Sequence, residues 1–134
     1  MAFAVSRDGR VSILLVEDSE NSAAMLEIAL QDIPGVELVA ARSGIDALRH
    51  LRLSPVDAII TDLNMPRMDG FELISRIRDD EALSHIPVVV VSADTDPATP
   101  RRLSELGVQA FFPKPYSPAQ VRRTLEQLLD VPAR

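Results

Sequence analysis

Short apolar segments alternate with helical patterns along the chain, five times in succession. Val11–Val16 is rich in β-formers and too short for a buried helix, and Val88–Val91 is an uninterrupted apolar run. Uninterrupted apolar strands suit a sheet that is covered on both faces, which indicates parallel strands. The predicted strands are Val11–Val16, Val36–Ala40, Asp57–Thr61, Pro87–Ser92 and Val108–Phe112.

Helical patterns follow each predicted strand, with apolar residues recurring three and four positions apart. Asp69–Glu72 and Ser117–Gln120 have the spacing of N-terminal capping boxes, and Thr99–Pro100 suits an N-cap followed by proline. The prolines of Asp94–Pro100 predict a late start for the fourth helix, and Gly107 is expected to end it. The predicted helices cover Ser19–Gln31 and Ser43–Leu53 and begin at Asp69, Thr99 and Ser117.

Alternating strands and helices predict a doubly wound α/β domain, here a flavodoxin-like (βα)5 three-layer sandwich. Its parallel sheet is expected to have the strand order 2-1-3-4-5. The domain is predicted over residues 11–130, with an N-terminal extension at 1–10 and a tail at 131–134. The chain ends favour a free-standing protein over a domain cut from a longer one.

Composition narrows the possible functions. The formal net charge of −6 argues against non-specific nucleic-acid binding, which depends on clustered Lys and Arg. The chain has no cysteine, which excludes disulfides, thiolate metal sites and cysteine nucleophiles. No apolar segment approaches the roughly 20 residues of a membrane span, and the first ten residues do not read as a signal peptide. A cytoplasmic location without membrane insertion is therefore expected.

Reactive side chains follow the carboxyl ends of four predicted strands. Glu17 and Asp18 follow the first strand, Asp62 follows the third, Ser92 ends the fourth and Lys114 follows the fifth. If the order is 2-1-3-4-5, the first and third strands are neighbours and their carboxylates converge in one pocket. Mutual repulsion favours a divalent cation there, and oxygen ligands without Cys or His point to Mg²⁺. This set suits phosphoryl transfer with a carboxylate nucleophile.

Each of these residues also has an ordinary interpretation. Glu17 and Asp18 could be a solvated pair that caps a helix, and Asp62 could be a turn residue. Ser92 by itself is more often a loop hydroxyl, and Lys114 more often a surface lysine. Only the combination of all of them, each at a strand end, is specific.

Four segments together resemble the response-regulator receiver domains of two-component signalling, whose simplest member is the chemotaxis response regulator. The resemblance runs from about Val11 to Leu129. The segments that carry it are Leu15–Ser19, Thr61–Gly70, Val91–Ala93 and Phe112–Pro115.

The resemblance implies a metal-dependent phosphoacceptor site. Asp62 would accept the phosphoryl group, and Glu17 and Asp18 would hold Mg²⁺ or Mn²⁺ together with Asp62. The main-chain carbonyl of Asn64 would be a further metal ligand. The side chain of Asn64 would tune the lifetime of the phosphorylated state.

The resemblance also implies a switch. Ser92 would bond the phosphoryl group and move toward it, and Lys114 would pair with that group beside a cis peptide bond to Pro115. Phe111 sits at the aromatic switch position, where it lacks the hydroxyl of a tyrosine, and Asp94 would help to tune the lifetime. Pro113 removes an N–H at the end of an edge strand, which is tolerable there.

The implied function is that of a phosphorylation switch with only limited self-phosphorylation and self-dephosphorylation chemistry, and not that of an enzyme. A histidine kinase or histidine phosphotransfer protein would donate the phosphoryl group, and a downstream protein would read the result. No direct contact with nucleic acid is expected, and the protein is expected to be a monomer or a weak dimer.

Two other functions remain open. A metal-dependent phosphatase with an aspartyl nucleophile would carry a second acid two residues later, where this chain has Asn64, which cannot donate a proton as a carboxylic acid does. An interaction module with an inert pocket is the other, although the complete set of reactive residues argues against it.

Overall fold

The computed structural model describes residues 10–130 and contains five strands and five helices in strict alternation. Apart from Arg10, the predicted N-terminal extension and tail lie outside the described residues. The strands are β1 (Val11–Val16), β2 (Val36–Ala41), β3 (Ala58–Thr61), β4 (Val88–Ser92) and β5 (Ala110–Pro113). The helices are α1 (Glu20–Leu30), α2 (Gly44–Leu53), α3 (Gly70–Asp79), α4 (Thr99–Glu105) and α5 (Pro118–Leu128).

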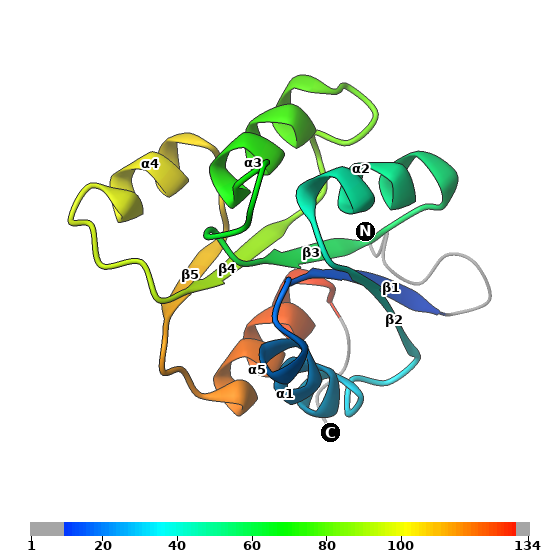
Figure 1. The fold of residues 1–134 in the computed structure, drawn as a ribbon. Coiled ribbons are helices and arrows are strands. Elements are labelled where there is room, and N and C mark those ends of the chain that lie inside the picture. The colour runs from blue at the N-terminus through cyan, green and yellow to red at the C-terminus, as the bar shows by residue number, and fades with distance from the viewer. Residues whose placement is uncertain (1–9, 131–134) are drawn as a thin grey trace.

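The five strands form one sheet in the order β2-β1-β3-β4-β5, and every pair is parallel. Figure 1 shows α1 and α5 on one face of this sheet and α2, α3 and α4 on the other. The predicted three-layer, flavodoxin-like architecture and its strand order are therefore confirmed.

Helices on both faces explain the uninterrupted apolar strands. Along β4, Val88 and Val90 belong to the core beneath α2 and α3, whereas Val89 and Val91 belong to the core beneath α1 and α5. Because side chains alternate across a strand, a strand covered on both faces needs apolar residues at consecutive positions. The two cores hold the sheet rigidly between the helical layers and leave its carboxyl edge free for polar side chains.

Helix starts agree with the predicted caps at two of the three positions. The Asp69 carboxylate accepts from the main-chain N–H of Glu72 at 2.9 Å, and the Ser117 hydroxyl accepts from that of Gln120 at 3.2 Å. The N-cap prediction for Thr99 is wrong by one residue, because Ala98 is the N-cap and Thr99 is the first helical residue. The Thr99 hydroxyl is engaged elsewhere, as described below.

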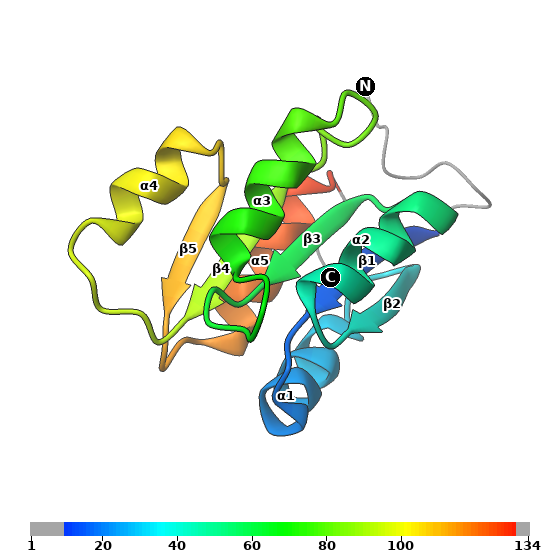
Figure 2. The ribbon, with the colours of Figure 1, turned by 45° about the horizontal axis from the view of Figure 1, so that its top comes forward.

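α4 is the shortest helix within residues 10–130 and begins late, as the prolines predict. Figure 2 shows it at the β5 edge of the sheet. Two of its seven residues are buried, Thr99 and Leu103. The helix stops before Gly107, whose φ of +73° is a left-handed value that favours glycine. None of the helices within residues 10–130 is both long enough and apolar enough to cross a membrane.

The guanidinium of Arg78 in α3 ties two loops to that helix. Nε donates to the carbonyl of Leu106 and Nη2 to that of Gly107, both at 2.9 Å. Nη1 donates to the carbonyls of Ser84 at 3.0 Å and Ile86 at 2.8 Å. Burial lowers the pKa of Arg78. This cation therefore satisfies main-chain acceptors at the end of α4 and in the loop before β4.

We expect Arg78→Met to lower the free energy of unfolding by about 2 kcal/mol or more, because four carbonyls lose their donor. Urea unfolding followed by circular dichroism measures this. The control is Arg76→Met in the same helix, which breaks an exposed pair with Glu72 and is expected to cost about 0.5 kcal/mol or less. Equal losses of unfolding free energy in the two variants would contradict the stabilising role of the Arg78 hydrogen bonds.

Candidate functional site

The carboxyl ends of β1 and β3 bring the three predicted carboxylates together. Val16 and Thr61 are partners in the parallel register, so the residues that follow them, Glu17 and Asp62, emerge side by side. Carboxylate oxygens of Glu17, Asp18 and Asp62 all lie within 4.8 Å of one another. Within the described part of the chain, this is the one group of His, Cys, Asp or Glu side chains placed to hold a metal ion.

The pocket is acidic and largely shielded from water. The side chain of Glu17 is 1% exposed and that of Asp62 is 9% exposed, whereas Asp18 lies at the surface. Burial is the largest influence on the pKa of Glu17 and raises it, and the neighbouring charge of Asp62 raises it further. Hydrogen bonding from the Ser19 N–H and the charge of Lys114 act in the opposite direction.

Lys114 supplies the positive charge of the pocket. Its main-chain N–H donates to the carbonyl of Ser92 at 2.9 Å, which continues the pairing of β5 with β4. Its Nζ lies 3.5 Å from Glu17 Oε1 and 3.5 Å from Asp62 Oδ2. The peptide bond between Lys114 and Pro115 is cis, as the resemblance implied. One amine thus faces carboxylates from two strands.

Main-chain groups orient the Asp62 carboxylate. Oδ1 accepts from the N–H of Leu63 at 2.6 Å and more weakly from that of Asn64 at 3.4 Å. Oδ2 is turned toward the amine of Lys114. The two oxygens therefore have different partners, and one of them faces the cation.

The loop that carries Asp62 is in close contact with the start of α3. The Gly70 N–H donates to the Leu63 carbonyl at 2.8 Å. A Cβ on Gly70 would lie 2.3 Å from the Asp62 carbonyl oxygen and 2.8 Å from Leu63 Cα, which are main-chain atoms. Glycine at this position is what allows the helix to support the loop so closely.

The remaining predicted residues lie around this pocket. Ser92 is completely buried at the end of β4, and its hydroxyl accepts from the main-chain N–H of Asp94 at 3.2 Å. Asn64 is exposed, and the Asp94 carboxylate is half-buried and accepts from Thr99. Phe111 is half-buried in β5 and packs against the core beneath α2 and α3. The structure shows where these four residues lie, and their roles in switching and in the lifetime of the phosphorylated state stay predictions.

Sequence reasoning missed Tyr116. Its ring packs against the core beneath α1 and α5, while burial, followed by the charges of Glu17 and Asp62, raises the pKa of its phenol. An aromatic residue two positions after Lys114 carried no signal of its own, because such residues are common in cores. Its nearness to the carboxylates follows only from the path of the chain after β5.

The donor set fits a hard divalent cation. Glu17, Asp18 and Asp62 offer oxygen ligands at mutually compatible distances, and their repulsion would be relieved by positive charge. The fit rests on oxygen chemistry and on the clustering of the three carboxylates.

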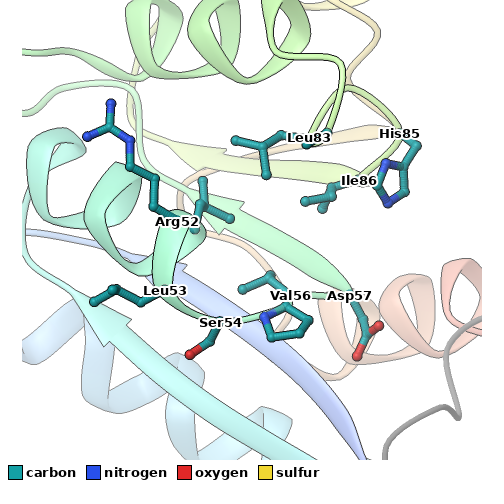
Figure 3. Close-up of a pocket in the computed structure, with 11 residues that line it drawn as sticks. Arg52, Leu53, Ser54, Val56, Asp57, Leu83, His85 and Ile86 are labelled. Atoms are coloured by element: carbon teal, nitrogen blue, oxygen red, sulfur yellow. The ribbon is translucent and has the colours of Figure 1, made fainter.

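A cavity of about 500 Å³ lies at the opposite, amino-terminal edge of the sheet. Figure 3 shows Arg52 and Leu53 at the end of α2, Asp57 just before β3, and Leu83 and His85 before β4. Its walls are mainly apolar and gather no cluster of acids. The clustered carboxylates and Lys114 therefore make the other edge the candidate functional site.

Comparisons with known proteins agree with this geometry. The family model described as the response regulator receiver domain matches residues 13–126. Chemotaxis protein CheY-3 of Vibrio cholerae is 29% identical over 120 residues, with 90% of this chain and 92% of that protein covered. The polar-differentiation response regulator DivK of Brucella ovis is 32% identical, with 88% and 95% covered.

Solved structures show the same class of fold. Chemotaxis response regulator CheY4 of Vibrio cholerae superposes with a TM-score of 0.80 at 30% identity, covering 90% of this chain and 99% of that one. The Mn²⁺-bound form of response regulator Rcp1 has a TM-score of 0.79 at 29% identity, with 92% and 99% covered. A doubly wound α/β domain with an acidic cluster at its carboxyl edge is the class that the fold and the site define. The chain belongs to the response regulator receiver domain family of two-component signalling.

The raised pKa of Glu17 predicts that its charge destabilises the metal-free fold. A carboxyl whose pKa is raised in the folded state opposes folding at pH values where it is ionised, and protonation removes that effect. We therefore expect Glu17→Gln to raise the melting temperature of the metal-free protein at pH 7. The advantage should shrink as the pH falls through the raised pKa of Glu17 and should be lost once the pH is below the ordinary value of 4.5.

Thermal unfolding in the presence of a chelator, followed across pH, measures the effect. Glu37→Gln, an exposed substitution on β2, serves as the control and should leave the melting temperature unchanged. Added Mg²⁺ should stabilise the parent protein more than Glu17→Gln, since the variant offers one carboxylate fewer. A variant that is less stable than its parent at pH 7 would refute the electrostatic argument.

Gly70 and Gly44 each begin a helix, but they differ in the atoms that surround them. Gly70→Ala forces main-chain atoms of the Asp62 loop to move, and we expect a loss of about 1–3 kcal/mol in the free energy of unfolding. Gly44→Ala meets only the flexible side chain of Met68, its nearest atom at 2.8 Å. Its loss should stay below about 1 kcal/mol. Denaturant unfolding of both variants measures the two losses of unfolding free energy. Equal losses would show that the Asp62 loop can move away from the added Cβ at little cost.

Proposed function

We propose that this receiver domain is a phosphorylation switch that accepts a phosphoryl group on Asp62. The observation that carries the proposal is the meeting of the Asp62 carboxylate with two further carboxylates and with the amine of Lys114. A nucleophilic oxygen, a place for a divalent cation and a fixed positive charge are the components that phosphoryl transfer to a carboxylate needs.

The donor in this proposal is a phosphohistidine of a histidine kinase or histidine phosphotransfer protein. An oxygen of the Asp62 carboxylate attacks phosphorus, the oxygen–phosphorus bond forms, and the phosphorus–nitrogen bond to the imidazole breaks. The leaving nitrogen keeps the electron pair of the broken bond. Oδ2 is suited to the attack because it faces the Lys114 amine, while main-chain N–H groups hold Oδ1.

Each neighbour has a role in this step. Lys114 Nζ pairs with a phosphoryl oxygen, and the Ser92 hydroxyl donates to another. Glu17, Asp18 and Asp62, with the main-chain carbonyl of Asn64, would hold Mg²⁺ or Mn²⁺. The ion when bound neutralises negative charge in the pocket and on the transferred group.

The proposal extends to the response and its duration. Ser92 and Phe111 act as switch residues, and Asn64 and Asp94 set the lifetime of the aspartyl phosphate. Because Phe111 has no hydroxyl, its position depends on packing alone. The domain is a signalling switch without turnover of an external substrate, and its output is a contact with a downstream protein.

Charge supports the choice of partners. A net charge of −6 suits a protein partner better than nucleic acid. We propose a cytoplasmic protein that is a monomer or a weak dimer and that does not insert into membranes. The kinase or phosphotransfer protein reaches the pocket at the carboxyl edge of the sheet, where the carboxylates open toward Asp18 at the surface.

Incubation with Mg²⁺ and acetyl phosphate tests the function. Intact-mass measurement should show one added phosphoryl group, which a chelator prevents because the carboxylates need the ion. Asp62→Asn should remain unmodified, and Lys114→Met should be modified roughly 10²-fold more slowly. Asp79→Asn, an exposed change at the end of α3, is the matched control and should be modified at the parent rate.

An Asp62→Asn variant that still gains the group would refute the assignment of the phosphoacceptor. Steady turnover of a phosphomonoester would favour a phosphatase over a switch.

A further inference from the structure

The loop between β4 and α4 is organised by two aspartates. The Asp94 Oδ1 atom accepts from the main-chain N–H of Asp96 at 2.8 Å, and Asp96 Oδ1 accepts from that of Ala98 at 2.9 Å. Each is a side-chain bond to the main chain two residues ahead, which folds the chain into a turn. Two such turns in succession join the end of β4 to the start of α4, so hydrogen bonds define the conformation of this loop.

Asp94 contacts both ends of this loop. Its main-chain N–H donates to the Ser92 hydroxyl at 3.2 Å, and its Oδ1 accepts from the Thr99 hydroxyl at 3.0 Å. Ser92 is 0% exposed and Thr99 is 2% exposed, so both hydroxyls are shielded from water. A continuous path of hydrogen bonds therefore leads from the pocket edge, through one residue, to the first turn of α4.

The start of α4 has no side-chain cap of its own. Ala98 at the N-cap has no side chain that can cap the helix, and the buried residues of α4 are Thr99 and Leu103. At its other end, the helix is held through the bonds that Arg78 makes to Leu106. In the last turn, the Arg102 guanidinium lies 3.7 Å from the centroid of the Phe71 ring in α3. The Thr99 hydroxyl bond to Asp94 is therefore the side-chain attachment of the first turn that leads toward the pocket.

We propose that the hydrogen bond between Thr99 and Asp94 couples the phosphorylation site to α4, an inference that rests on the proposed function. A serine hydroxyl has one hydrogen to donate and lone pairs to accept. Ser92 can therefore donate to a phosphoryl oxygen on Asp62 while it still accepts from the Asp94 N–H. When Ser92 moves toward the phosphoryl group, Asp94 moves with it, and its carboxylate draws Thr99 and the start of α4 along.

Thr99→Val separates this coupling from phosphorylation itself, because valine keeps the shape of threonine and lacks the hydroxyl. Hydrogen exchange of the main-chain amides over residues 99–105 is compared with and without acetyl phosphate and Mg²⁺, and intact mass reports modification of Asp62. In the parent protein, phosphorylation should change these exchange rates about fivefold or more. In Thr99→Val, Asp62 should still be modified, and the change at α4 should disappear.

Three further variants complete the design. Thr99→Ser retains a hydroxyl and should restore the response, and Ser104→Ala on the exposed side of α4 should behave like the parent. Asp94→Ala removes the acceptor and should lose the response as Thr99→Val does. The double variant should lose no more than either single change, since both act on one hydrogen bond.

The outcomes distinguish the two proposals. A phosphorylated Thr99→Val whose α4 responds as the parent does would overturn the coupling and leave the proposed function standing. A parent protein that takes no phosphoryl group under these conditions would overturn both. Loss of the response in Thr99→Ser as well would show that packing at this position matters rather than the hydroxyl, and would also overturn the coupling.

Discussion

The crowding of three carboxylates around one lysine amine is the constraint on which the rest of this structure depends. Two of the carboxylates are almost completely buried. Burial raises the pKa of Glu17, which means that its negative charge is unfavourable in the pocket. Lys114 offsets part of this cost from 3.5 Å. Such an arrangement persists only where the surrounding structure holds each group in place, and it is most favourable when further positive charge enters.

The elements around the pocket differ in how firmly they are held: β1, β3 and α3 are packed tightly, and α4 is packed less tightly. β1 and β3 are central strands covered on both faces, and Gly70 sets α3 directly against the loop that carries Asp62. α4, by contrast, buries two of its seven residues and is attached through the hydrogen bonds of Thr99 and Arg78 and through the contact of Arg102 with Phe71. Elements that move in a switch come from the less stable parts of a fold, whereas the chemical site needs the stable ones. The edge between β4 and α4 is where these two requirements meet.

Most of the fold could be predicted from local patterns. The consecutive valines of Val88–Val91 indicated a strand covered on both faces, and the caps at Asp69 and Ser117 lie where the capping-box spacing put them. The predicted start of the last strand was wrong: β5 begins at Ala110 and not at Val108, because the Val108 N–H is still bonded to the Leu103 carbonyl of α4. The convergence of Glu17, Asp18 and Asp62 was predictable only together with the strand order, which local patterns do not contain.

The sequence by itself determined the alternation of strands and helices, the side-chain caps at Asp69 and Ser117, and which reactive residues stand at strand ends. These depend on neighbours a few positions apart, so a linear pattern contains them. Only the tertiary structure decided that Thr99 donates to Asp94 instead of capping α4, that Arg78 binds carbonyls from two loops, and that Tyr116 lies near the carboxylates. The partner of a side chain depends on the path of the chain through space, and packing of the two cores around the sheet sets that path.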